Sequence, residues 1–162
     1  MQEKKIELSF ISAQLSELST QEKQLVANAK SAFTTAYAPY SGFLVGASVL
    51  LDNGEIINGS NQENVAYPSG LCAERVALFY AGARFPDVKI KTIAVSVMSK
   101  NFKVTDVISP CGACRQVMAE YEDKQEQAIK VILHSPTNQV LIANTVESLL
   151  PFMFKSPLLK QH

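Results

Sequence analysis

The segment from residue 72 to residue 114 begins with CAER, ends with PCGAC and contains the run IKTIAVSVM at residues 90–98. This run is rich in β-branched residues, which predicts a strand. Apolar residues recur at helical spacing over residues 71–83, and Pro110 stands where a second helix would begin, over residues 111–121. A helix, a strand and a helix in this order are typical of a layered α/β fold.

The flanking segments extend this alternation of helices and strands. Ser19 and Glu22 have the spacing of a helix-capping box and predict a helix that runs to about residue 36. The other elements expected from hydrophobic spacing and turn residues are a hairpin at 45–51 and 55–58 around Asp52-Asn53-Gly54, strands at 129–134 and 139–142, and a helical turn at 145–150. The whole pattern predicts an α/β fold in which a mixed sheet lies between helices.

The length of 162 residues fits one domain, and the sequence contains no repeat or linker that would divide it. Near the N-terminus, residues 4–10 alternate between apolar and polar side chains. This alternation fits a short strand or arm, and a position so close to the chain end fits a loose tail equally well.

Composition and charge exclude several functional classes. Fifteen Lys and Arg residues balance fifteen Asp and Glu residues, so no net charge draws the chain to nucleic-acid polymers. The most apolar stretches are about half the ~20 residues that a membrane span needs, and the first residues contain no apolar run of signal-peptide length. We therefore expect a cytoplasmic protein that binds neither polymeric nucleic acid nor a membrane.

The three cysteines, Cys72, Cys111 and Cys114, all fall at expected helix N-termini. Backbone N–H groups and the helix dipole stabilise thiolates there, and the thiolate is the form that binds metal. An odd number of cysteines without a secretion signal argues against a disulfide framework. Three thiolates can share one zinc ion, and three protein ligands leave a fourth position for water, as in catalytic zinc sites.

Glu74 lies two residues from Cys72, where a carboxylate can accept a proton from such a water. Two other interpretations of the cysteines are open: a redox pair, or a structural zinc site that His134 would close. The order Cys-x-Glu and then Pro-Cys-x-x-Cys matches the zinc deaminase signature in its three-cysteine form. This combination favours catalysis, and we expect His134 to pack away from the metal.

Four motifs occur in order: YSGFLVGA at 40–47, NQEN at 61–64, CAER at 72–75 and PCGACRQ at 110–116. Over residues 22–154 the sequence resembles the cytidine deaminase family, of the small homotetrameric, three-cysteine type. The resemblance implies a three-layer α/β/α fold with a central mixed sheet. It also implies an N-terminal extension over residues 1–20 and a single cytidine deaminase domain over residues 21–162.

The resemblance assigns roles around the metal to five residues. Cys72, Cys111 and Cys114 would bind one Zn²⁺ per chain. Glu74 would be the catalytic residue that shuttles protons. Arg75 would compensate the thiolate charge.

The resemblance also assigns roles in substrate binding. Asn61 and Glu63 would bind the 3′-hydroxyl of a sugar, Phe43 would pack on a pyrimidine, and the backbone N–H of Ala73 would meet the base carbonyl. Phe154, in the C-terminal stretch, would reach the site of a neighbouring subunit. The implied assembly is a homotetramer with active sites near its subunit interfaces.

The implied activity is that of EC 3.5.4.5, the zinc-dependent hydrolysis of cytidine and 2′-deoxycytidine to uridine and 2′-deoxyuridine with release of ammonia, in pyrimidine salvage. The substrate would be a small nucleoside. One alternative is a related deaminase of an aminopyrimidine antibiotic or free base, which has no sugar for Asn61 and Glu63 to bind. A second alternative is a non-catalytic zinc module, which would have no use for Glu74.

Overall fold

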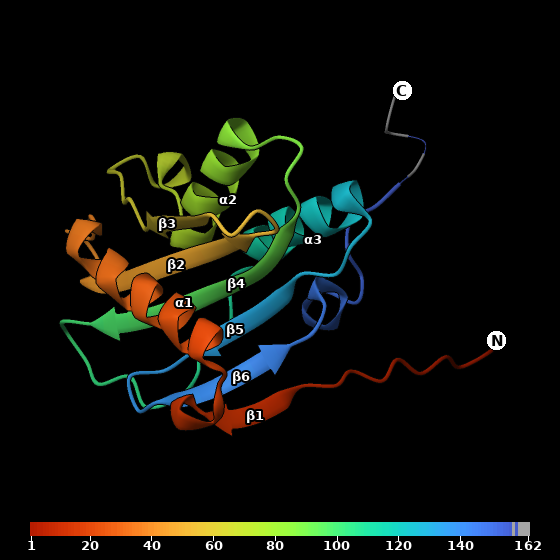
Figure 1. Ribbon diagram of the computed structural model, residues 1–162, viewed down its shortest axis with the longest axis horizontal. Helices are drawn as coiled ribbons and strands as arrows, with labels where there is room; N and C mark the ends of the chain where they lie inside the picture. The colour runs from red at the N-terminus through yellow and green to blue at the C-terminus, as the bar shows by residue number, and fades with distance from the viewer. Residues whose placement is uncertain (157, 159–162) are drawn as a thin grey trace.

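A mixed sheet of six strands lies between layers of helices (Figure 1). The computed structural model describes residues 1–156 and 158. The elements in chain order, with η for a 3-10 helix, are β1 (Ile11–Gln14), η1 (Leu15–Glu17), α1 (Thr20–Ser31), η2 (Ala32–Thr35), β2 (Phe43–Leu51), β3 (Ile56–Ser60), η3 (Tyr67–Ser69), α2 (Ala73–Arg84), β4 (Ile90–Ser99), α3 (Gly112–Gln125), β5 (Lys130–His134), β6 (Gln139–Ala143) and η4 (Val146–Leu149). Helix α1 covers one face of the sheet, and α2 and α3 cover the other. The predicted three-layer α/β/α fold is confirmed.

The direction of the strands decides where the helices begin. The strand order is β1-β6-β5-β4-β2-β3, in which β4 and β5 are parallel and the other neighbouring strands are antiparallel. Because β2 is antiparallel to both β3 and β4, those two strands point the same way. Helix α2 follows β3 along the chain, and α3 follows β4. Both helices therefore begin beyond the carboxyl ends of these strands, at one edge of the sheet.

Two apolar clusters, one on each face of the sheet, hold the three layers together. Neighbouring strand residues point to opposite faces, so Ile93 packs on the side of α2 and α3 whereas Ala94 packs on the side of α1. The α1 side includes Leu25, Val26, Ala29, Leu50 and Ile132, and the other side includes Val49, Ala77, Leu78, Met118 and Val131. Each large aliphatic side chain buried in this way contributes about 1.5–3 kcal/mol.

Most elements expected from the sequence are present with small shifts of their ends. Helix α1 begins at the predicted capping box, where the Glu22 N–H donates to Ser19 Oγ over 3.3 Å and the Ser19 N–H donates to Glu22 Oε2 over 3.0 Å. The predicted hairpin is also present, and Gly54 in its turn has a φ of +88°. Helix α3 continues to Gln125, four residues beyond the expected end, and the last expected helical turn has 3-10 geometry.

The N-terminal segment does not form the short strand that was one of the structures expected at residues 4–10. Residues 1–10 have no secondary structure, and the strand β1 begins only at Ile11. In β1, Ile11 lies opposite Ile142 and Ala13 lies opposite Val140 of β6. The segment expected to be an extension thus supplies an edge strand to the sheet, because the backbone of β6 offers a partner to residues 11–14.

Gly59 of β3 allows α2 to approach the sheet closely. The Cβ of an alanine at this position would lie 2.6 Å from the carbonyl oxygen of Ala73 and 2.6 Å from the backbone nitrogen of Ala77. Both atoms belong to the backbone of α2, which cannot move aside as a flexible side chain can. The missing side chain at Gly59 therefore determines how near the start of α2 lies to the sheet.

We predict that Gly59→Ala lowers the free energy of unfolding by about 1–3 kcal/mol, the usual cost of overpacking, because α2 must move outward. Gly112→Ala is the matched control, since a methyl group there meets no atom within 4 Å. Urea unfolding followed by circular dichroism measures both variants. Equal stability of the two would contradict the close approach of α2.

Candidate metal centre and active site

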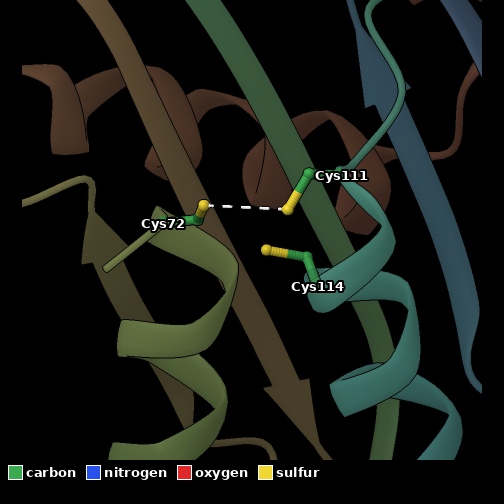
Figure 2. A group of neighbouring side chains, drawn as sticks. All are labelled: Cys72, Cys111 and Cys114. Atoms are coloured by element: carbon green, nitrogen blue, oxygen red, sulfur yellow. Dashed lines mark hydrogen bonds between the residues drawn. The ribbon is translucent and has the colours of Figure 1, made fainter. Parts of the chain in front are cut away.

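Three cysteine side chains converge where α2 and α3 begin (Figure 2). Cys72 directly precedes α2, Cys111 directly precedes α3, and Cys114 lies in the first turn of α3. The two cysteine motifs are far apart in the sequence, and they meet because β3 and β4 bring both helices to one edge of the sheet.

The spacing of the sulfur atoms fits a zinc ion. All three Sγ atoms lie within 4.8 Å of one another, and those of Cys72 and Cys111 are 3.9 Å apart. Two sulfurs that each lie ~2.3 Å from a tetrahedral zinc are about 3.8 Å apart. Among residues 1–156 and 158, no other group of three Cys, His, Asp or Glu side chains has such spacing. Three thiolates form the donor set of an open zinc site.

Positive charge balances the thiolates. They lie at two helix N-termini, where the helix dipoles favour negative charge. Arg75 Nη2 lies 3.8 Å from Cys72 Sγ and also donates to the carbonyl oxygen of Gly70 over 3.3 Å. A hydrogen bond from the Cys114 thiol, together with the Arg75 guanidinium, lowers the pKa of the Cys72 thiol to about 5. Cys72 is therefore a thiolate at neutral pH, ready to bind metal.

Glu74 lies in the first turn of α2 with only 4% of its surface exposed. Burial and, to a smaller extent, the negative charge of Cys72 raise the pKa of its carboxyl above the ordinary value. Its Oε2 atom is buried and has no hydrogen-bond partner within the described residues. An unpartnered buried carboxyl oxygen is costly unless a ligand pairs with it, so Glu74 is a candidate for contact with a bound polar group.

A cavity of about 650 Å³ opens beside the cysteines. Its volume lies within the roughly 300–1,000 Å³ range of small-molecule sites. The expected site residues that line the cavity are Phe43, Asn61, Glu63, Cys72, Glu74, Arg75 and Cys111. One cavity therefore joins Cys72, Cys111, the buried carboxyl and the polar residues that follow β3, whereas Cys114 lies outside its lining.

Glu63 is held in place by the turn that precedes β2. The backbone N–H groups of Tyr40 and Ser41 donate to its Oε2 atom over 2.8 and 3.3 Å, and the Ser41 hydroxyl donates to Oε1. Burial of the Glu63 carboxyl acts to raise its pKa, but these hydrogen bonds outweigh that effect and lower the pKa. The carboxylate at this wall of the cavity is therefore ionised and fixed in orientation.

Asn61 and Phe43 are joined through the backbone of β2. Asn61 Oδ1 accepts from the Val45 N–H and Asn61 Nδ2 donates to the Phe43 carbonyl, both over 2.8 Å. The amide still has one N–H and one oxygen lone pair for a ligand. The structure thus places Asn61 so that it orients the start of β2 and faces the cavity at once.

Ala73 and Phe154 lie outside the lining of this cavity. Ala73 is fully buried as the first residue of α2, beside Cys72. Phe154 exposes 75% of its surface, and its backbone is tied to the Gln116 side chain by two hydrogen bonds of 2.8 and 2.9 Å. Phe154 is therefore largely exposed and does not contribute to this cavity.

The profile of the family described as "cytidine and deoxycytidylate deaminase zinc-binding region" matches residues 19–129, more than half of the chain. The chain belongs to this family. It is 42% identical over 98 residues to a cytidine deaminase of Halalkalibacterium halodurans, covering 60% of this chain and 70% of that protein. It is 44% identical over 102 residues to one of Sporosarcina psychrophila, covering 61% and 68%.

Solved structures of the cytidine deaminase family share the fold. The crystal structure of cytidine deaminase from Burkholderia pseudomallei superposes with a TM-score of 0.71 at 36% identity, covering 85% of this chain and all of that chain. The enzyme from Mycobacterium tuberculosis gives a TM-score of 0.66 at 30% identity, with the same coverage. The resemblance and the fold inferred from the sequence motifs are therefore confirmed.

Two residues that sequence reasoning assigned no role support the cavity of this deaminase-family chain. Asn101 Nδ2 donates to the Ser41 carbonyl over 2.8 Å, and the ring of Phe102 stacks on Phe43 with centroids 6.1 Å apart and an interplanar angle of 9°. Ser41 lies within the motif YSGFLVGA at residues 40–47, so the sequence indicates its importance. Asn101 and Phe102 lie in the loop after β4, where no spacing or motif marks them.

His134 does not approach the cysteines. It lies in β5 on the face that packs against α1, where its Nδ1 atom is 2.7 Å from Ser96 Oγ and only 2% of its surface is exposed. Burial lowers the pKa of the imidazole, so His134 is neutral at pH 7. The expectation that it packs away from the metal agrees with this placement.

We predict that the free energy of unfolding falls as the pH decreases through about 6.5, because the unfolded chain then binds a proton that folded His134 does not accept. The slope from this residue approaches at most ~1.4 kcal/mol per pH unit. Urea titrations between about pH 5 and pH 7 should show the slope in the parent protein and a smaller one in His134→Gln. Identical slopes would mean that His134 titrates normally in the fold.

Proposed function

We propose that this protein hydrolyses cytidine and 2′-deoxycytidine to uridine and 2′-deoxyuridine with release of ammonia, as a step of pyrimidine salvage. The observation that carries the proposal is the buried Glu74 carboxyl, whose Oε2 atom has no hydrogen-bond partner within the described residues, in a cavity beside the three converging sulfurs. Membership of the family and similarity to proteins named cytidine deaminase support it. A redox pair or a structural zinc site would have no use for such an acid–base group.

We place one zinc ion per chain on Cys72, Cys111 and Cys114. When bound, zinc supplies Lewis acidity that lowers the pKa of water at its open position. The chain holds the three sulfurs at the required spacing, and two helix N-termini and Arg75 would balance the charge of the thiolates that bind the metal. Within the described residues, the only histidine, His134, lies on the other face of the sheet and leaves the fourth position open.

Glu74 moves the protons in this proposal. Its carboxylate accepts a proton from the attacking water and transfers it to N3 of the base, and the same carboxyl then protonates the departing amine. The water oxygen stays on C4, one water proton goes to N3, and the other leaves with ammonia. Because Glu74 Oε2 is buried, bulk solvent does not compete for these protons at that atom.

Phe43, Asn61 and Glu63 give the cavity the chemistry of a nucleoside site. An aromatic ring can pack on a flat base, and an amide with a carboxylate can bind hydroxyl groups. Glu63 uses three of its roughly four acceptor positions for Tyr40 and Ser41, so one position remains for the 3′-hydroxyl. An ionised carboxylate also repels phosphate, which favours nucleosides over nucleotides.

The proposal includes a homotetramer in which active sites lie near subunit interfaces. Phe79 and Tyr80 on the outer face of α2 are 44% and 56% exposed. Large exposed aromatic side chains are typical of a surface that another subunit covers. Phe154 exposes its ring away from its own cavity, which suits a contribution to a neighbouring site.

We further propose a cytoplasmic location. No helix within residues 1–156 and 158 is long and apolar enough to cross a membrane.

We predict that Glu74→Gln keeps about one zinc ion per chain and the parent thermal stability, while kcat for cytidine falls by at least ~10²- to 10⁴-fold. The amide preserves size and can still form hydrogen bonds, but it cannot accept a proton from water. Zinc is counted by atomic absorption, and turnover is followed by ultraviolet absorbance. The control is Glu55→Gln in the exposed hairpin turn, which should match the parent. Near-normal turnover of Glu74→Gln would remove Glu74 from the mechanism.

We predict that Glu63→Ala lowers kcat/KM for cytidine by about 10- to 100-fold, the effect of losing a charged hydrogen bond to the sugar. The parent protein should use both nucleosides far better than cytosine or cytidine monophosphate. Glu55→Ala is the matched control, because it removes a carboxylate outside the cavity. Equal use of free cytosine, or an unchanged Glu63→Ala, would favour a free-base or antibiotic deaminase instead.

A further inference from the structure

The N-terminal arm, residues 1–10, lies outside the part of the chain that matches the family profile. Figure 1 shows it running away from the sheet beyond β1. Within the described residues, no hydrogen bond or ion pair engages its side chains. Ile6, Leu8 and Phe10 expose 53%, 45% and 40% of their surfaces. The arm thus presents three large apolar side chains that remain largely exposed among the described residues.

The arm also continues a strand with a free edge. Strand β1 is the last in the sheet order, so only β6 pairs with it among residues 1–156 and 158. If the backbone of β1 continues into the arm, Ile6, Leu8 and Phe10 lie on one face, because alternate residues of a strand point the same way. A free edge with an apolar row is a template for pairing with another strand.

We propose that the N-terminal arms of two copies of this chain pair as antiparallel strands, with Leu8 of one copy opposite Leu8 of the other. In this register each Ile6 lies opposite Phe10, so all three apolar positions face apolar partners. The charged residues of the arm lie opposite neutral ones, in the pairs Glu3–Ala13, Lys4–Ser12, Lys5–Ile11 and Glu7–Ser9. No two like charges face each other in this register. The arm is therefore complementary to a second copy of itself, both in its apolar pairs and in its charges.

A competing register places Ile6 opposite Ile6. It forms two exposed Lys5–Glu7 ion pairs, each worth about 0–1 kcal/mol, but it sets Leu8 opposite Lys4 and Phe10 opposite Gln2. The Leu8 register instead makes three apolar cross-strand pairs and shields aromatic and branched side chains from water. The apolar gain exceeds that of two exposed ion pairs, so the Leu8 register is favoured.

This pairing would join two sheets edge to edge through a two-fold axis at Leu8. It is independent of the cavity, because residues 1–10 do not line it. It is also independent of the proposed activity, so a failure of either proposal leaves the other standing.

The test is cysteine cross-linking of the full-length, zinc-loaded protein. Leu8→Cys puts two thiols directly opposite each other, and mild oxidation should convert most chains to a covalent dimer on a non-reducing gel. Ile6→Cys is the matched control, since its copies would lie about 14 Å apart along the strands, beyond the reach of a disulfide. The parent protein, with its three native cysteines, gives the background.

The expected result is a dimer for Leu8→Cys that persists on tenfold dilution, with Ile6→Cys at the background level. Adding Phe10→Asp to Leu8→Cys should reduce the dimer at least several-fold, because the apolar pairs are lost. A Leu8→Cys protein that stays monomeric on the gel would overturn the proposal and leave the arm to a different partner. Equal cross-linking of Ile6→Cys would overturn it as well, because it excludes the Leu8 register.

Discussion

The active site depends on the common direction of β3 and β4. These strands bring two helix N-termini to one edge of the sheet, and each N-terminus stabilises a nearby thiolate by about 0.3–1 kcal/mol or more when buried. If one of the strands ran the other way, its helix would begin at the opposite edge. Cys72 and Cys111 would then be separated by the length of a strand such as β4, about 30 Å.

Contacts at the starts of α2 and α3 fix the positions of the sulfurs relative to the sheet. On the side of α2, Gly59 lets the helix backbone lie against β3. On the side of α3, Arg115 Nε donates to the Pro110 carbonyl over 2.7 Å and Arg115 Nη1 donates to the Leu149 carbonyl over 3.1 Å, which ties the segment before Cys111 to η4. The start of α2 is therefore held by close backbone packing and that of α3 by side-chain hydrogen bonds, so a small shift of either one would change the spacing of the sulfurs.

Local patterns predicted the elements whose causes are local. The capping box at Ser19 is present, and the spacing of Cys72 from Glu74 needs only one turn of helix to put both beside the cavity. The alternation at residues 4–10 could not distinguish a short strand or arm from a loose tail, because a strand also needs a partner and the pairing with β6 begins at residue 11. The contacts of Asn101 and Phe102 depend on where a loop lies after folding, which no spacing in the chain reports.

The hydrogen bonds to Glu63 have a further consequence for affinity. Three donors from the 40–41 turn already restrict the torsions of this side chain, and Asn101 restrains the turn in its own right. The rotational freedom of a long carboxylate side chain is thus lost during folding rather than when a ligand arrives. Such preorganisation spares a ligand about 0.5–1.5 kcal/mol of ordering cost, equivalent to roughly two- to twelvefold in the dissociation constant.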